Sequence, residues 1–288
     1  MSTDSPVPSL RDVIHRYGLS ARKSLGQHFL LDSNITEKIV RLSGELGGLN
    51  VIEIGPGPGG LTRSLLHSDA RCIYAIEKDD RCVAALAELS ATAKGRLVIH
   101  EQDALEFSCV KEIEAPRAIV ANLPYNVGTI LLIHWLGDIA LHGSHAYQHL
   151  TLMFQKEVAE RLFAEPNSKQ YGRLSVLVQW LCDVEHCFDL PPSAFTPPPK
   201  VASTVVRLVP LAKPRYEAEK EKLERTLAAA FGQRRKMLRS ALSQITPNTL
   251  SWLKKAGIDP TRRAETLSIE EFCALARSIP SASGNPHP

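Results

Sequence analysis

Short apolar runs alternate with segments of helical periodicity through the first half of the chain. The apolar, β-branched runs are residues 51–55, 71–77, 96–100, 117–122 and 149–154. Between them, residues 61–67, 79–89 and 127–136 repeat apolar side chains at the spacing of one helical face. Strands and helices that alternate in this order predict βαβ units, and therefore a mostly parallel sheet with helices on both faces.

The pattern continues with two more strand-like runs and then changes. Residues 174–188 and 203–209 are read as strands, which gives an α/β, Rossmann-like domain with a sheet of seven strands over residues 1–210. Beyond Pro210 the β-branched runs stop, and residues 220–231, 247–257 and 268–279 have helical patterns. The last of these opens with Ser268 and Glu271, spaced as a capping box. We therefore expect a small all-helical domain over residues 211–280 and a disordered tail over residues 281–288.

The chain has 288 residues, and its composition is that of an ordinary soluble protein. The most apolar stretch, GTILLIHWLG, contains His134 and is too short for a membrane span, so no membrane association is expected. The N-terminal MSTDSPVPSL has neither the pattern of a secretory signal nor that of a transit peptide. The six cysteines form no CxxC pair and the ten histidines no HExxH. These features predict a cytoplasmic protein without a metal site.

Positive charge is concentrated in the C-terminal part. Residues 212–263 hold 13 Lys or Arg against 5 Asp or Glu, whereas the rest of the chain holds 21 against 26. A basic segment attached to a mildly acidic domain is typical of a protein that binds a polyanionic partner, although helices with solvated faces would give the same excess of positive charge.

A glycine-rich loop follows the first strand, in the sequence VIEIGPGPGGLT. Gly55, Gly57 and Gly60 match G-x-G-x-x-G, and Glu77 ends the next strand, which is also the pattern of a dinucleotide site. Glu53 in the first strand would repel a pyrophosphate, but it suits a ligand with an amino group and a sulfonium. Asp103 follows the third strand and could accept from an adenine amino group. The three carboxylates together favour an S-adenosylmethionine site over a dinucleotide site.

The segment NLPY, residues 122–125, ends the fourth strand. Asn122 and the carbonyl of Leu123 could each accept one hydrogen from an adenine N6, so that its lone pair faces the methyl donor. Pro124 keeps Leu123 out of the helical region, and Tyr125 could stack on the base. Turn formation alone would explain Asn and Pro but not the aromatic residue.

The chain resembles the small-subunit rRNA adenine dimethyltransferases over nearly its whole length. The resemblance lies in residues 24–32, 53–62, 122–129, 153–162, 195–208 and 231–238. It implies a Rossmann-like class I methyltransferase domain in which residues 1–48 cap the cofactor site. It also implies transfer of methyl groups from S-adenosylmethionine to two adjacent adenosines in the 3′-terminal hairpin loop of small-subunit rRNA. The expected partner is a pre-30S-type particle, bound by a monomer without a metal.

The resemblance also assigns roles to individual residues. It places cofactor contacts on His28, Leu30, Gly55, Glu77, Asp103 and Asn122, which joins the expectation for Glu53 and Gly57. His28 departs from the Asn that many members carry there, but an imidazole can still make one hydrogen bond. Phe195 corresponds to a second aromatic that closes on the flipped base. The resemblance also places Lys200 near the RNA backbone. The charge of residues 212–263, and not the resemblance, makes Arg234, Arg235, Lys236 and Arg239 expected RNA contacts, with Arg22 as a further one. Arg235, Lys236 and Arg239 are expected close together on one helix.

The sequence leaves two alternatives open. A large-subunit rRNA adenine methyltransferase of the macrolide-resistance type shares the fold and an Asn-Pro-aromatic motif. A non-catalytic rRNA-binding assembly factor would share the fold but would not need Glu53, Glu77, Asp103 and NLPY.

Overall fold

A computed structural model describes residues 8–20 and 26–280 of the chain. Contacts between Cα atoms divide the chain into two compact units, Met1–Ala159 with Val184–Pro210, and Glu160–Asp183 with Leu211–Pro288. The predicted domain boundary at residue 210 coincides with one of these divisions. The predicted tail, residues 281–288, lies outside the described residues.

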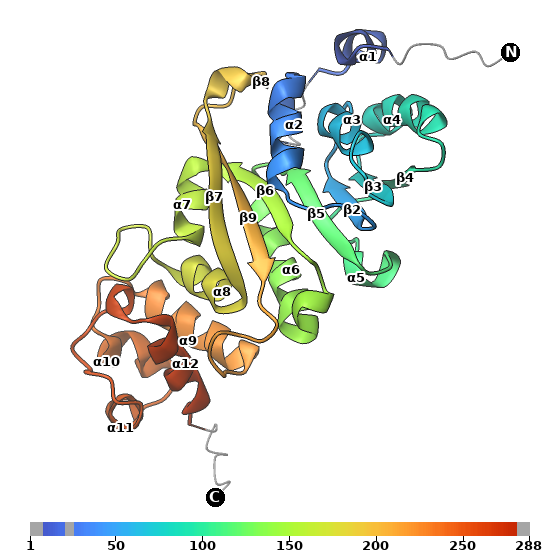
Figure 1. The fold of residues 1–288 in the computed structure, drawn as a ribbon. Coiled ribbons are helices and arrows are strands. Elements are labelled where there is room, and N and C mark those ends of the chain that lie inside the picture. The colour runs from blue at the N-terminus through green and yellow to red at the C-terminus, as the bar shows by residue number, and fades with distance from the viewer. Residues whose placement is uncertain (1–7, 21–25, 281–288) are drawn as a thin grey trace, which may run out of the picture. The chain divides into compact units, whose positions relative to one another are not determined.

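The first unit is built on a seven-stranded sheet with the order β4-β3-β2-β5-β6-β9-β7 (Figure 1). The strands β2 to β6 pair in parallel and β9 pairs antiparallel to β6, which confirms the predicted mostly parallel sheet. Their bounds are β2 Asn50–Ile54, β3 Cys72–Glu77, β4 Leu97–Glu101, β5 Arg117–Asn122, β6 Leu150–Gln155, β7 Cys182–Leu190 and β9 Ser203–Pro210.

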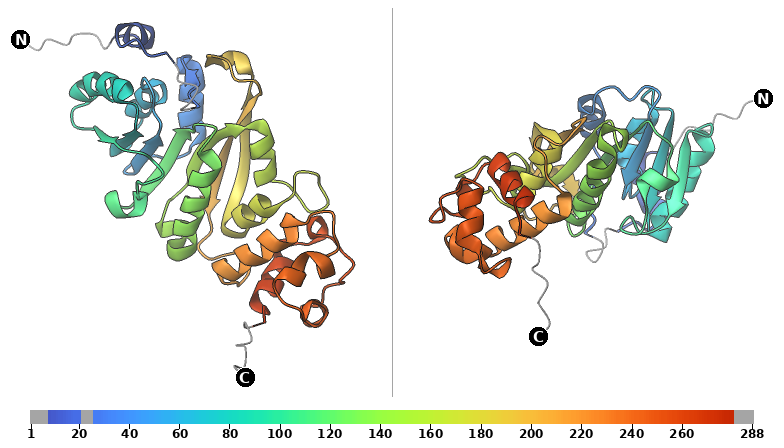
Figure 2. Two further views of the ribbon diagram at one scale, coloured as in Figure 1. Left: turned by 180° about the vertical axis from the view of Figure 1, so that it is seen from behind. Right: turned by 90° about the horizontal axis from the view of Figure 1, so that it is seen from below.

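The central strands are buried on both faces, as a parallel sheet between helices requires. Every residue of β2 is buried, and so are five of the six residues of β5. The long helix α6 lies behind the strands in Figure 1 and in front of them in the reverse view of Figure 2. The helices of this unit are α1 Leu10–Arg16, α2 Ser33–Leu42, α3 Gly60–Leu66, α4 Asp80–Thr92, α5 Cys109–Glu112 and α6 Gly128–His142, and α7 Lys156–Leu162 crosses into the second unit.

A second, two-stranded sheet joins segments that are far apart in the sequence. Strand β1 (Phe29–Leu30) pairs antiparallel with β8 (Phe195–Thr196), and Leu30 lies opposite Phe195. This pairing brings residues 29–30 beside residues 195–196. No periodicity in the sequence predicted it, because strands of two residues leave no repeat to recognise.

One predicted strand is a helix over half its length. We read residues 174–188 as a strand, but Arg173–Leu181 form helix α8 and only the remainder belongs to β7. Nearly every residue of α8 from Ser175 on is buried, so the helix has no polar face that would reveal its period.

Residues 160–183, which we predicted to belong to the first domain, fall in the second unit together with α8. There the Trp180 indole donates to the Tyr216 carbonyl at 2.7 Å, and the Tyr171 hydroxyl donates to the Leu267 carbonyl at 2.9 Å. The other helices of this unit are α9 Lys220–Gly232, α10 Leu238–Ala241, α11 Thr249–Lys255 and α12 Ile269–Arg277.

The predicted capping box of α12 is confirmed. The Ser268 hydroxyl accepts from the Glu271 amide at 3.2 Å, and the Glu271 carboxylate accepts from the Ser268 amide at 2.7 Å.

Among the described helices, none is long and apolar enough to cross a lipid bilayer.

Candidate functional site

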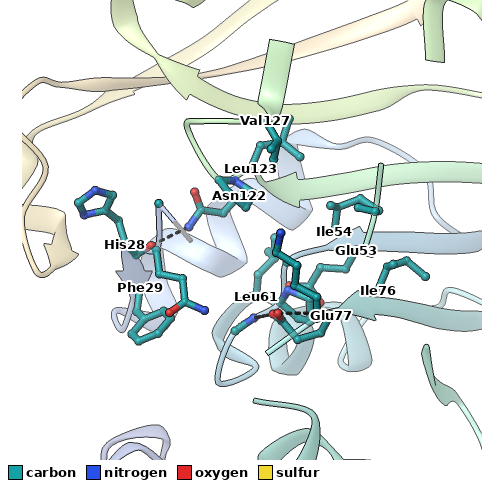
Figure 3. Close-up of a pocket in the computed structure, with 18 of the residues that line it drawn as sticks. His28, Phe29, Glu53, Ile54, Leu61, Ile76, Glu77, Asn122, Leu123 and Val127 are labelled. Atoms are coloured by element: carbon teal, nitrogen blue, oxygen red, sulfur yellow. Dashed lines mark hydrogen bonds between the residues drawn. The ribbon is translucent and has the colours of Figure 1, made fainter. Parts of the chain in front are cut away.

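A pocket opens at the carboxyl ends of β2, β3, β4 and β5, where ligands of open α/β sheets bind. All but one of the predicted catalytic and cofactor residues line it (Figure 3). These are His28, Leu30, Glu53, Gly55, Gly57, Glu77, Asp103, Asn122, Leu123, Pro124 and Tyr125. Parallel topology explains the gathering, because the ends of neighbouring parallel strands reach the same edge of the sheet.

The glycine loop forms the floor of this pocket and lies tightly against the N-terminal segment. Gly57 has a φ of 56°, and a Cβ atom there would lie 3.0 Å from the Phe29 ring. At Gly60, the first residue of α3, a Cβ atom would lie 2.5 Å from the Leu30 carbonyl oxygen. The glycines therefore allow residues 29–30 to cover the loop.

Glu77 is held rigidly at the end of β3. One carboxylate oxygen accepts from the Gly57 amide at 3.0 Å, and the other accepts from the amides of Lys78 and Asp79, both at 2.9 Å. The side chain is 5% exposed, and its burial raises the pKa while the three amides oppose that shift. A carboxylate has about four acceptor sites and the amides occupy three of them, so the oxygen that accepts from Gly57 can still accept from one ligand hydroxyl.

Glu53 is buried in the middle of the site without full hydrogen bonding. It is 2% exposed, and within the described part of the chain its Oε2 atom has no hydrogen-bond partner. Burial raises the pKa of Glu53 to about 8, and the negative charge of Glu77 acts in the same direction. A buried carboxyl with an unused oxygen fits a ligand that brings a cationic amino group.

Asp103 lies beyond β4 and is ionised. Its Oδ1 atom accepts from the Leu105 amide at 3.0 Å, and its Oδ2 atom is 3.0 Å from the Lys78 ammonium. The Leu105 amide and Lys78 lower the pKa of this carboxyl. We did not predict Lys78 as a site residue. Its position in the sequence could have indicated the contact. Lys78 directly follows Glu77 at the end of β3, and the parallel strand β4 places Glu101, two residues before Asp103, opposite Glu77.

Asn122 has one end of its amide fixed and the other free. Its Nδ2 atom donates to the His28 carbonyl at 3.1 Å, and a carbonyl only accepts, so this contact sets the orientation of the amide. Among the described residues, none donates a hydrogen bond to the Oδ1 atom of Asn122. The amide oxygen is therefore available to a ligand N–H.

Tyr125 is anchored at its hydroxyl, which lies 2.5 Å from the Ser203 hydroxyl at the start of β9. Burial raises the pKa of Tyr125, so the phenol stays neutral. The ring lies beside the His28 imidazole, with 5.2 Å between ring centroids. Sequence reasoning missed Ser203, because its closeness to Tyr125 depends on the pairing of β9 with β6.

Phe195 does not line the pocket. It is only 3% exposed and packs in the hydrophobic core of the first unit. Its ring meets His28 edge-on, with 6.5 Å between centroids and an angle of 80° between planes.

The predicted RNA-contact residues are less uniform. Arg22 lies outside the described residues, and Lys200, Arg235, Lys236 and Arg239 are exposed. Arg234 is half-buried, donates to the Ser168 carbonyl at 3.2 Å and pairs with Glu265 at 3.7 Å.

The prediction that Arg235, Lys236 and Arg239 lie close together on one helix was wrong. Helix α9 ends at Gly232 and α10 begins at Leu238, so Arg235 and Lys236 lie in the connecting turn. A bridge between Met237 and Arg263 fixes extended backbone at the end of this turn.

A family model described as ribosomal RNA adenine dimethylase matches residues 18–280. A curated relative from Ruegeria sp. (strain TM1040) is 54% identical over 97% of this chain and 99% of its own length. It is named ribosomal RNA small subunit methyltransferase A. The protein of the same name from Rhodospirillum rubrum is 55% identical over 96% of this chain and 94% of its own.

Two solved structures share the fold. A dimethyladenosine transferase from Plasmodium falciparum superposes with a TM-score of 0.70 at 24% identity, over 86% of this chain and 96% of its own. The 23S rRNA methyltransferase ErmE superposes with a TM-score of 0.63 at 25% identity, over 87% of this chain and 99% of its own.

Proposed function

The chain belongs to the ribosomal RNA adenine dimethylase family, and from this premise we propose that it dimethylates N6 of adenosines in small-subunit rRNA, with S-adenosylmethionine as methyl donor. The targets are two adjacent adenosines in the 3′-terminal hairpin loop, presented by an assembling small-subunit particle in the cytoplasm. The protein acts as a monomer.

The observation that carries this proposal is that Nδ2 of Asn122 is bound to the His28 carbonyl, whereas Oδ1 of the same amide is available to a ligand. Adenine N6 is a poor nucleophile because its lone pair is delocalised into the ring. With Nδ2 fixed on the His28 carbonyl, Oδ1 of Asn122 can accept one N6 hydrogen, and the Leu123 carbonyl accepts the other. The lone pair of N6 is then directed at the methyl group. No general base is required, since N6 becomes acidic once methylated and releases its proton to water.

The carboxylates hold the methyl donor, and the donor supplies an electrophilic methyl on its sulfonium. Glu77, fixed by three backbone amides, accepts from a ribose hydroxyl. Asp103 accepts from the adenine amino group, and Glu53 faces the cationic amino group of the methionine part. The unused oxygen of buried Glu53 supports this assignment, because a pyrophosphate would place more negative charge beside it.

The exposed cations bind the RNA backbone. Arg235, Lys236 and Arg239 are free to reach phosphates, and we assign Lys200 and Arg22 to further phosphates of the same RNA. Arg234 instead stabilises the second unit through Ser168 and Glu265. The target adenosine, unpaired in its loop, swings into the NLPY pocket.

The proposal is tested by offering the purified protein unmethylated small and large ribosomal subunits together with S-adenosylmethionine labelled in the methyl group. We expect label in small-subunit rRNA only. Label in large-subunit rRNA would instead support a macrolide-resistance type of activity. RNA binding without any label would support a non-catalytic assembly factor.

A further inference from the structure

The ring beside Tyr125 that can meet an incoming base belongs to His28. Its imidazole lies 5.2 Å from the Tyr125 ring, with 32° between planes, within the range of interacting aromatic pairs. His28 is partly exposed and lines the pocket, whereas Phe195 is buried and does not. Figure 3 shows the imidazole turned away from Glu53 and Glu77, the end assigned to the methyl donor.

Three contacts hold His28 in this position. Its Nδ1 atom lies 2.8 Å from the Pro197 carbonyl oxygen, and a carbonyl only accepts, so Nδ1 carries the hydrogen. Its own backbone carbonyl accepts from Asn122, and its ring rests on the edge of Phe195. The residue thus links β1, the segment after β8 and the NLPY segment.

We propose that His28 is a substrate-binding residue, which extends the Tyr125 ring into one aromatic surface on which the target adenine stacks. This inference rests on the proposed function. The two rings are too close for a base to enter between them, since stacking on both sides needs about 7 Å. The base therefore lies against the pair, and the Phe195 ring packs edge-on with the histidine ring.

Three substitutions of His28 distinguish the contribution of its ring from that of its hydrogen bond to Pro197. The His28→Phe variant keeps a ring and loses the donor to Pro197, whereas His28→Asn keeps a polar donor and loses the ring. His28→Ala loses both, and His145→Ala removes a histidine of the same unit that does not line the pocket. Each variant is assayed for the KM of unmethylated small subunits, and its Kd for S-adenosylmethionine is measured by calorimetry.

We expect His28→Ala and His28→Asn to raise the KM for small subunits by roughly 5- to 100-fold, the range expected when one base-stacking interaction is removed. The Kd for S-adenosylmethionine should change less than about twofold, because the Asn122 contact uses the backbone of residue 28. His28→Phe should restore most of the affinity for small subunits, and His145→Ala should match the wild type.

Two results would overturn the proposal while the wild type still methylates small subunits. A weaker Kd for S-adenosylmethionine with an unchanged KM for small subunits would make His28 a cofactor residue. If His28→Asn but not His28→Phe has a KM for small subunits near that of the wild type, His28 acts through its hydrogen bond to Pro197 and not as a stacking surface. A wild type that labels no small subunits would refute the proposed function itself, and is thereby distinguishable.

Discussion

The two regions assigned to the reaction are built in opposite ways. At the carboxyl edge of the sheet, Glu53 and Glu77 are buried, and Glu77 is held by the amides of Gly57, Lys78 and Asp79. In the turn between α9 and α10, Arg235 and Lys236 are exposed side chains on a short connection. A buried group fixed by the backbone can orient a small ligand, whereas exposed cations follow a polyanion by charge. We therefore expect substitutions in the first region to affect the geometry of the reaction, and substitutions in the second to affect the salt dependence of RNA affinity.

The largest effect is expected from Asn122→Ala, which tests geometry at the sheet edge. In the proposed mechanism the amide oxygen acts on N6 in the transition state, so the single-turnover rate should fall by about 100- to 1000-fold, as for other preorganised hydrogen-bonding groups. The Kd for S-adenosylmethionine should change less than about fivefold, as measured by calorimetry. A folded variant with a rate near that of the wild type would remove Asn122 from the mechanism.

The second effect concerns Glu77. Replacement by Gln keeps the shape of the side chain but removes its charge and one acceptor, so affinity for S-adenosylmethionine should fall about 10- to 100-fold. Glu77→Ala should bind as weakly and should lower the melting temperature more than Gln does, because the amides of Gly57, Lys78 and Asp79 all lose their acceptor, whereas Gln keeps one accepting oxygen. Calorimetry and thermal denaturation separate the two effects. Unchanged affinity in the Gln variant, or tight dinucleotide binding by the wild type, would contradict the assignment.

A third prediction uses the buried Glu53, whose pKa is raised from 4.5 to about 8 by burial. The folded protein keeps this proton over a range in which the unfolded chain has lost it. The stability of the wild type should therefore decrease relative to Glu53→Gln as the pH rises from 4.5 to about 8, by at most about 5 kcal/mol in total. Denaturant unfolding of both proteins at several pH values checks this. Parallel stability curves would show that Glu53 does not titrate in this range.

The smallest effect should come from the exposed turn. Replacing Arg235, Lys236 and Arg239 together with Gln should lower the slope of log affinity against log salt by roughly 0.7 to 0.9 for each phosphate that the variant no longer binds. The control is Arg234→Gln, which should reduce thermal stability and leave the slope nearly unchanged, because Arg234 pairs with Glu265. Titration of small subunits at several salt concentrations supplies the slopes. An unchanged slope in the triple variant would leave these cations structural and place RNA docking near Lys200.

The same contrast explains what could be predicted from the sequence. Glu53, Glu77 and Asn122 were brought into one pocket because each lies at or near the end of a parallel strand, and the topology places those ends together. The charge of the turn between α9 and α10 was equally visible. Its shape was not, because Gly232 ends α9 and the bridge from Met237 to Arg263 interrupts the helix.

The other differences between expectation and structure come from tertiary contacts. Helix α8 is so fully buried that its sequence has no polar face, and its hydrogen-bond partners lie far along the chain. Phe195, which we predicted to close on the base, lies opposite Leu30 across β1 and β8 and is buried, whereas His28 lines the pocket. A single motif does not contain the information about which of two rings faces outward.

The most direct test of the account is mass spectrometry of rRNA fragments from unmethylated small subunits after incubation with S-adenosylmethionine and either the wild type or Asn122→Ala. The account predicts N6,N6-dimethyladenosine at two adjacent adenosines near the 3′ end with the wild type, and almost none within the same time with Asn122→Ala. Methylation at another atom or in another RNA, or equal product from the two proteins, would contradict it.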